Sequence, residues 1–302
     1  MKPLISVIIP LAPNRPCEAI PSIEAQGIPV EIIVERGKNP SQNRNRGITR
    51  AKAEIIAFLD AHSLLPKDWS KHVLALFESN PQIDAIGGPQ LTAPNESRFG
   101  VISGYALSST FGAAGSSTRY SPRHPIQDAD ERYMTSANLV CRRRVIEKVR
   151  FDETLWPGED PKFISDARNA GFSLLFHPNI FVYHTRRATV GDFARQIFNY
   201  GYTRPKKEAL TETLFHPSFL VPPAFTVYLA LFTILAFINP LFIVPLALYL
   251  ALLIIFSFYE GAIKNSDPVS AFYLPFIFFT IHITYGLGFI SGTFKQWFKK
   301  DP

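Results

Sequence analysis

The chain is poor in cysteine, since only Cys17 and Cys141 occur among its 302 residues. Two cysteines build no disulfide framework and are typical of a reducing compartment. No RNA- or DNA-binding signature accompanies the net charge of +6, so nucleic acid is not expected as a partner. A secretory signal is also missing, because Met1-Lys2-Pro3 leads directly into a short apolar run. We therefore expect the polar part of the chain on the cytoplasmic face of a membrane.

Charge is absent from Thr213 to Tyr259, a run of 47 residues. As a helix this run would be about 70 Å long, more than twice the ~30 Å hydrocarbon core of a bilayer. Asn239-Pro240 divides it and predicts two helices, over about 219–238 and 241–258. A third charge-free run follows at 269–294. Buried core helices are the alternative, but three consecutive runs favour a multi-pass protein of the cytoplasmic membrane.

Positive charge lies mainly before these runs. From Thr213 onward there are four lysines and three acids, a net +1, which leaves +5 of the total +6 for residues 1–212. Each basic residue close to a membrane surface strengthens binding to anionic headgroups by about 1 kcal/mol. With three full spans, however, Lys295, Lys299 and Lys300 would lie outside, against the usual bias of positive charge toward the cytoplasm. A re-entrant or interfacial third run would remove this conflict.

The first 60 residues alternate between strand-like and helix-like patterns. Apolar runs over 4–10, 30–35 and 55–59 predict strands, and a helix from about Gln42 is predicted between the second and the third. Such alternation is typical of an α/β fold with a mostly parallel sheet. From Thr92 to Tyr133 the periodicity fails, so this range is predicted to be irregular.

Polar side chains follow the third predicted strand directly. Asp60 and His62 come after the apolar run Ile55–Leu59, at the carboxyl end of a strand, where α/β sheets bind ligands. Residues i and i+2 of an extended chain point the same way and can share one cation. The alternative is that Asp60 is only a turn former.

Two predicted helix starts also carry candidate residues. Ser41 is placed to cap the helix that holds Arg44 and Asn45 in its first turn, which predicts a phosphate site. Glu159-Asp160 begins a second helix, where the macrodipole favours ionised acids. These two acids can also be explained as helix-start charge alone.

Seven short motifs occur along the chain in one order. They are Ser6-Val7-Ile8-Ile9-Pro10, Arg44-Asn45-Arg46-Gly47-Ile48, Phe58-Leu59-Asp60-Ala61-His62, Ala137-Asn138-Leu139-Val140-Cys141-Arg142-Arg143, Phe151-Asp152-Glu153, Gly158-Glu159-Asp160, and Arg195-Gln196 with Tyr200-Gly201-Tyr202-Thr203-Arg204. Together they resemble the family 2 glycosyltransferases, the inverting transferases of the GT-A fold, and among them the membrane-attached succinoglycan-biosynthesis type. The resemblance implies a GT-A domain over 1–188, an amphipathic interfacial helix and linker over 189–212, and a membrane region over 213–302.

The resemblance also implies a reaction, the transfer of a sugar from a UDP- or GDP-sugar donor to a lipid-linked or membrane-bound acceptor. Asp60 and His62 match the D-x-D signature that holds a divalent metal, Mn²⁺ or Mg²⁺, and the imidazole favours Mn²⁺. His184 matches a further metal ligand, with a plain interface histidine as the alternative. Asp160, with Glu159 beside it, matches the catalytic base.

The remaining implied site residues fall into two groups. Donor-binding residues would be Pro10, Glu35, Arg44, Asn45, Asp60, Arg195, Gln196 and Arg204. Acceptor-side residues would be Ser136, Asn138 and Trp156. For Arg195, Gln196 and Arg204, contact with the membrane surface is the alternative.

The chain departs from the family pattern after the second strand. The usual acidic turn and a further helix and strand are missing, and Glu35-Arg36-Gly37 leads almost directly to the Arg44 helix. Glu35 would replace the acid that contacts the base or ribose, which leaves the nucleotide open. A catalytically silent membrane scaffold that binds nucleotide-sugar or a partner transferase is the second hypothesis. A transporter is the third, and the lack of intramembrane acids argues against it.

Overall fold

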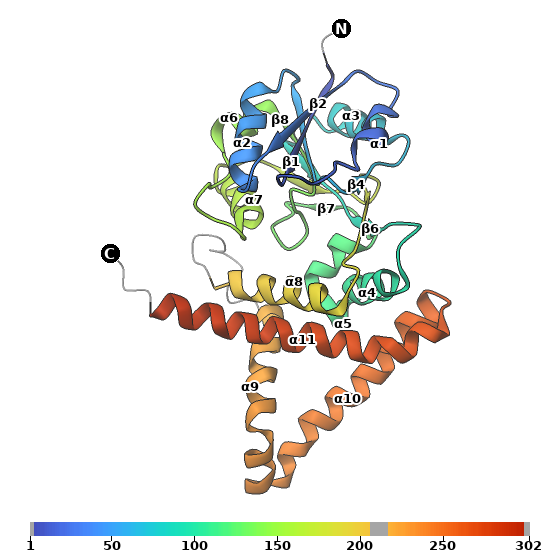
Figure 1. The fold of residues 1–302 in the computed structure, drawn as a ribbon, viewed down its shortest axis with the longest axis vertical. Helices are drawn as coiled ribbons and strands as arrows, with labels where there is room; N and C mark the ends of the chain where they lie inside the picture. The colour runs from blue at the N-terminus through green and yellow to red at the C-terminus, as the bar shows by residue number, and fades with distance from the viewer. Residues whose placement is uncertain (1–2, 206–216, 299–302) are drawn as a thin grey trace. The chain divides into compact units, whose positions relative to one another are not determined.

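The computed structural model describes residues 3–205 and 217–298. The chain forms two compact units (Figure 1). The first contains Met1–Asn95 and Thr118–Thr185, and the second contains Glu96–Ser117 and Arg186–Pro302. Residues Glu96–Ser117 thus belong to the second unit although they lie inside the range 1–188.

The first unit is built on a seven-stranded mixed sheet. Its strand order is β2 (Val30–Arg36), β1 (Ile5–Leu11), β3 (Ile55–Leu59), β8 (Asn138–Arg142), β5 (Ala85–Gly87), β9 (Leu174–Phe176) and β7 (Ile126–Gln127). β1 pairs in parallel with β2 and β3, and β5 with β9, whereas β8 runs antiparallel to β3 and β5, and β7 to β9. All five residues of β3 are buried, which explains its continuous apolar sequence. The predicted α/β fold class is confirmed.

Helices cover both faces of this sheet, which gives two hydrophobic cores. On one face lie α2 (Pro40–Arg50), α6 (Arg143–Lys148) and α7 (Glu159–Asn169), and on the other lie α1 (Ile20–Glu24) and α3 (Trp69–Ser79) (Figure 1). The first core contains Ile48 and Phe163, and the second contains Trp69 and Val73.

A second sheet of three short strands stands beside the first. Its order is β4 (Ser63–Leu64), β10 (Val182–His184) and β6 (Gln90–Thr92). β10 pairs antiparallel to β4 with His184 opposite Ser63. This register brings a residue from the end of the first unit next to the segment that follows β3.

The second unit is helical. It contains α4 (Arg98–Ser108), α5 (Thr110–Ala113), α8 (Val190–Thr203), α9 (Pro217–Ile238), α10 (Ile243–Phe258) and α11 (Pro268–Trp297). Among the described residues, three helical segments are long and apolar enough to cross a membrane: Pro217–Ile238, Pro240–Lys264 and Pro268–Gln296.

The prediction that 92–133 is irregular was wrong. The eleven residues of α4 lie within this range, followed by α5, the 3-10 helix η1 (Ala114–Tyr120) and β7. The buried side of α4 includes the small residues Gly100, Ser103 and Gly104. Small buried residues produce little hydrophobic periodicity, so the helix left no amphipathic pattern in the sequence.

Candidate active site

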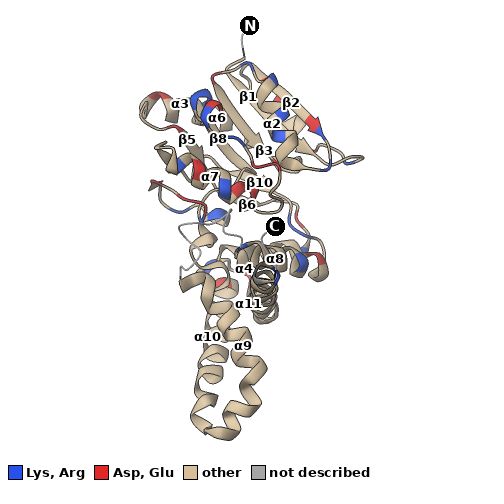
Figure 2. Ribbon diagram, turned by 90° about the vertical axis from the view of Figure 1, so that its left-hand side faces the viewer, with Lys and Arg blue, Asp and Glu red and all other residues tan. Residues whose placement is uncertain are grey.

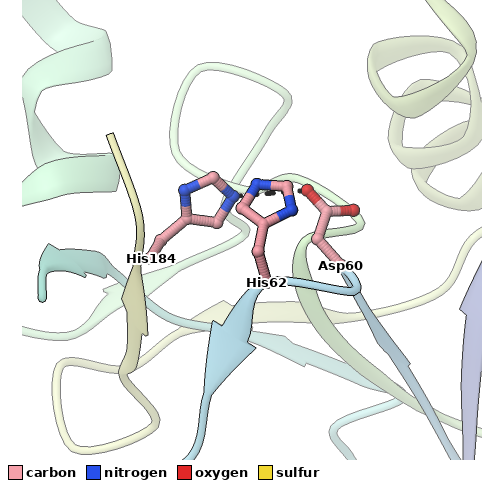
Figure 3. Close-up of side chains that lie close together, drawn as sticks. All are labelled: Asp60, His62 and His184. Carbon is pink, nitrogen blue, oxygen red and sulfur yellow. Dashed lines mark hydrogen bonds and ion pairs between the residues drawn. The ribbon is translucent and has the colours of Figure 1, made fainter. Parts of the chain in front are cut away.

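Asp60, His62 and His184 lie together at the carboxyl end of β3 (Figure 3). His184 Nε2 is 3.3 Å from Asp60 Oδ2, and the rings of His62 and His184 are 4.3 Å apart. One ligand atom from each residue lies within 4.8 Å of the others. Because metal bonds of about 2.1 Å place neighbouring ligands about 3 Å apart, small side-chain rotations would close the cluster around one ion.

The hydrogen bonds of His184 fit a metal ligand. Its Nδ1 faces the carbonyl oxygen of Thr185 at 3.1 Å, and its Nε2 faces the Asp60 carboxylate. A neutral imidazole has one N–H, which Thr185 O would take, leaving the Nε2 lone pair directed at Asp60. A cation between Nε2 and the carboxylate satisfies both groups, and a backbone carbonyl that fixes the other nitrogen is usual for metal-bound histidine.

Asp60 is charged under ordinary conditions. Burial favours the protonated carboxyl, but the contact with His184 and the nearby His62 and Arg44 lower the pKa of Asp60 below its ordinary value. An ionised carboxylate is the form that binds a divalent cation.

Arg44 connects this cluster to a second group of acids. Its guanidinium lies 3.8 Å from Asp60 Oδ1, 3.0 Å from Glu159 Oε1 and 3.6 Å from Asp160 Oδ1. The Arg44 side chain is 5% exposed, and it stands over the Phe151 ring at 5.1 Å. The buried Arg44 guanidinium therefore pairs with three carboxylates, one from the residue after β3 and two from the start of α7.

The position of Arg44 differs from the predicted one. Asn39, not Ser41, caps α2 by accepting hydrogen bonds from the N–H groups of Ser41 and Gln42, so the helix begins at Pro40. Arg44 is then the fifth helical residue and lies beyond the orphan N–H groups of the first turn. Asn45 Nδ2 donates to the Phe151 carbonyl at 2.8 Å, and the Phe151 N–H donates to Asn45 Oδ1 at 3.1 Å. Its carboxamide thus fastens α2 to the loop before α7.

The two acids at the start of α7 have different surroundings. Gly158 precedes them with a φ of +120°, a conformation that favours glycine. The Glu159 side chain is 9% exposed, accepts from Arg44 and receives the Gly158 N–H. Burial and the charge of Asp160 raise the pKa of Glu159 above its ordinary value, although Arg44 opposes the shift. The Asp160 side chain is 24% exposed, and its Oδ1 accepts from Ser136 Oγ at 2.5 Å.

The other predicted residues of the first unit lie in varied environments. Glu35 accepts hydrogen bonds from Arg50 at 2.5 Å and Arg46 at 3.2 Å; burial opposes their effect, but together they lower its pKa. Pro10 stands in β1 opposite Glu35. Asn138 is buried and donates to the Ile180 carbonyl at 2.6 Å, whereas Trp156 is 60% exposed.

Three predicted donor-binding residues belong to the second unit. Arg195 and Gln196 are on α8, where Arg195 pairs with Asp192 at 3.2 Å and Gln196 donates to Tyr200 Oη at 2.8 Å. Arg204 follows α8, is buried, and lies over the Phe219 ring at 3.4 Å.

Two contributors were missing from the sequence-based prediction. Phe151 supports the Arg44 guanidinium, and the Thr185 carbonyl orients His184. Phe151 stands in a quoted motif, but its contact with Arg44 spans more than a hundred residues of sequence. A backbone carbonyl leaves no side-chain signal at all.

The chain is similar in sequence to known glycosyltransferases. Residues 16–150 match glycosyl transferase family 2. The pre-mycofactocin glycosyltransferases of two Mycobacterium tuberculosis strains, CDC 1551 / Oshkosh and ATCC 25618 / H37Rv, are 29% identical over 170 residues. The match covers 56% of this chain and 35% of those proteins, so the chain aligns with about a third of their length.

One solved structure shares the fold at low sequence identity. The mannosyltransferase PcManGT from Pyrobaculum calidifontis, solved in complex with GDP-Man and Mn²⁺, aligns with a TM-score of 0.56 and 15% identity, over 100% of this chain and 89% of that chain. TarS of S. aureus aligns with a TM-score of 0.41 and 16% identity, over 68% of this chain and 40% of that chain. These similarities support a family 2 glycosyltransferase, and the chain shares the fold of the mannosyltransferase PcManGT.

Proposed function

We propose that the protein is an inverting, metal-dependent glycosyltransferase that moves a sugar from a nucleotide-sugar to a lipid-linked or membrane-bound acceptor. The supporting observation is that one buried guanidinium, Arg44, contacts both Asp60 of the histidine cluster and Asp160 at the start of α7. An inverting transfer needs a cation at the leaving diphosphate and a base on the opposite face of the sugar. The residues proposed for these two roles both contact Arg44.

Asp60, His62 and His184 would hold the divalent metal. When bound there, the ion would neutralise the negative charge that develops on the diphosphate leaving group. The two imidazoles make this donor set softer than paired carboxylates, so we propose Mn²⁺ ahead of Mg²⁺. The PcManGT structure contains Mn²⁺, which supports the same choice.

Asp160 is the proposed base, and Glu159 a positioning residue. Asp160 is the more exposed of the two acids. Its Oδ1 is occupied by Ser136 and Arg44, while its Oδ2 has no hydrogen-bond partner within residues 3–205 and 217–298. An oxygen without a donor is available to the acceptor hydroxyl. Glu159 is buried against Arg44 and would keep the guanidinium in place.

The acceptor class is inferred from the second unit. Three helical segments long and apolar enough to cross a membrane would hold the enzyme where lipid-linked substrates reside. The polar first unit is proposed to lie on the cytoplasmic face. The donor is proposed as a UDP- or GDP-sugar, with the GDP-Man complex of PcManGT favouring a guanine nucleotide. Glu35 is proposed to lie beside the nucleoside.

The proposal is tested on purified full-length protein in detergent. A panel of UDP- and GDP-sugars is incubated with Mn²⁺ and lipid extract, nucleoside diphosphate release is measured, and the anomeric configuration of the product is determined. Asp60→Ala should abolish release. Asp68→Ala, which removes an exposed carboxylate paired with Lys71, is the matched control and should retain nucleoside diphosphate release.

Three outcomes would contradict the proposal. Unchanged release by Asp60→Ala would exclude the metal site, and a retained anomeric configuration would exclude inversion. Donor binding by calorimetry without turnover on any lipid fraction would indicate a catalytically silent scaffold.

A further inference from the structure

The helix α11 is buried along one side and exposed along the other. Positions buried in the second unit recur at helical spacing: Ser270, Leu274, Ile277, Phe278, Ile281, His282, Gly288 and Gly292. The exposed positions Phe272, Phe276, Phe279, Leu287 and Phe294 form a single stripe opposite them, at 100° per residue. This exposed stripe, referred to as the apolar stripe, contains no charge. It is interrupted at Gly286, where an added Cβ would meet Thr226 and the Pro222 carbonyl of α9.

The buried side of α11 meets α8 backbone to backbone. A Cβ added at Gly201 of α8 would meet the backbone of Tyr285, and one added at Gly288 or Gly292 would meet that of Phe198 or Tyr202. Gly288 faces Phe198 and Gly292 faces Tyr202, so residue numbers rise together along the contact and the two helices run side by side in the same direction (Figure 1). Glycines permit this close approach.

The apolar face of α8 is covered by protein. Phe193 is 1% exposed and packs edge to face on Phe99 of α4, and Ile197 is 3% exposed. The opposite face carries Asp192 and Arg195, whose side chains are 52% and 75% exposed. A charged residue at the centre of a bilayer costs about 2.5–3.5 kcal/mol or more, so α8 belongs outside the hydrocarbon. Since α11 lies along it, α11 cannot cross the bilayer there.

The first half of α11 is fixed on its buried side as well. Arg98 of α4 donates to both carboxylate oxygens of Asp267, at 2.6 and 2.8 Å, and Asp267 caps α11. Farther along, His282 Nε2 bonds the Phe111 carbonyl at 2.8 Å, and the Phe278 ring packs on that of Phe111. Short helices therefore cover α11 along its length.

The other apolar helices leave this layer in a different direction. α9 and α10 form a hairpin that turns at Asn239 and extends away from α8 and α11, without a charged residue along either helix (Figure 2). The 22 residues of α9 make about 33 Å of helix, enough to cross the hydrocarbon core.

We propose that α11 lies in the plane of the membrane interface, with its apolar stripe on the acyl chains and α8 stacked on its other side, and that only the α9–α10 hairpin enters the bilayer. One-sided apolar helices bind lipid surfaces in this way. The chain then re-emerges on the side of the membrane from which it entered, so Lys295 lies on that side. This agrees with the bias of positive charge toward the cytoplasm. The proposal does not depend on the reaction catalysed.

The proposal is tested by measuring the depth of spin labels in lipid vesicles. Full-length protein with Cys17→Ser and Cys141→Ala receives single cysteines at Phe272, Phe279, Leu287 or Phe294, and depth is read from relaxation by oxygen and by a water-soluble nickel complex. All four labels should lie at one shallow depth. Labels at Ile234 and Leu248 of the hairpin, which are exposed at 62% and 60%, are the matched references and should lie deeper.

A spanning helix would give a different depth profile. Phe272 and Phe294 are 22 residues apart, about 33 Å along a helix, so their labels would lie near opposite surfaces with Phe279 and Leu287 deep between them. That profile, or a lack of lipid contact at all four sites, would overturn the proposal.

A reporter fused to the C-terminus gives a second measurement without labels in the helix. Its enzymatic activity or fluorescence should place the C-terminus on the same side as a reporter at the N-terminus. A C-terminus on the opposite side would overturn the proposal.

Discussion

Asp160 and Glu159 are neighbours in sequence but should differ strongly in their effect on catalysis. Asp160→Asn keeps the shape of the side chain and removes the base, so kcat should fall by about 10²–10⁴-fold while donor binding persists. Glu159→Gln keeps a hydrogen-bond acceptor for Arg44 and should lower kcat by less than about tenfold. Turnover and donor titration calorimetry measure both effects.

A control for these variants lies farther along the same helix. Asp166→Asn removes a half-exposed acid that pairs with Lys162 at 2.7 Å, and kcat should not change. If Glu159→Gln were the more damaging substitution, the assignment of base and positioning residue would have to be exchanged.

His62 should determine which metal supports turnover. His62→Asp replaces an imidazole with a harder carboxylate, which favours Mg²⁺ over Mn²⁺. The ratio of the Mg²⁺ rate to the Mn²⁺ rate should rise by about tenfold, equivalent to ~1.4 kcal/mol. Rates are measured after chelation of adventitious metal and titration with each ion. His72→Asp, on the exposed face of α3, serves as the control, and an equal ratio in both variants would argue against His62 as a ligand.

At the scale of elements, the contact between α8 and α11 should be sensitive to single methyl groups. Alanine is a better helix former than glycine by about 0.8–1.0 kcal/mol, yet in Gly288→Ala the added carbon would meet the backbone of Phe198. Backbone atoms cannot rotate away, so the helices must separate, at a typical cost of about 1–3 kcal/mol. The apparent Tm in detergent should therefore fall by several degrees. Gly191→Ala, where the added carbon has only Thr189 Oγ1 within reach, at 4.0 Å, should leave the Tm unchanged or raise it.

Elements with a strong local pattern could be predicted from the sequence. β3 is a run of five apolar residues that ends at Asp60, and this pattern needs no knowledge of distant residues. α4 left no such pattern, because Gly100, Ser103 and Gly104 face its neighbours. The predicted start of α2, at about Gln42, was too late in the sequence. Asn39 and Ser41 can both cap a helix, and Asn39 is the residue that caps α2.

The site depended on contacts between distant parts of the chain. The sequence placed Arg44 at a phosphate because Arg44 and Asn45 were expected in the first turn of a helix. Its three carboxylate partners become visible only when β3 and α7 are folded beside α2. Likewise, the pairing of β10 with β4 places His184 beside Asp60, and neither short strand has a pattern that specifies its partner.

At the scale of the whole molecule, the acceptor should be drawn from the membrane rather than from water. A lipid-linked acceptor and an enzyme anchored by apolar helices lie in the same membrane or micelle. The rate of sugar transfer should therefore depend on the number of acceptor molecules per unit area of that surface. In mixed micelles with a constant total acceptor concentration, a tenfold excess of empty micelles dilutes the acceptor on the surface but not in the bulk. The rate should therefore fall severalfold when acceptor is below saturation. A water-soluble acceptor analogue with a short chain is the control, and its rate should not respond to added micelles. Equal rates with the lipid-linked acceptor before and after dilution would mean that it reaches the site from solution, and the acceptor class proposed for this enzyme would then be wrong.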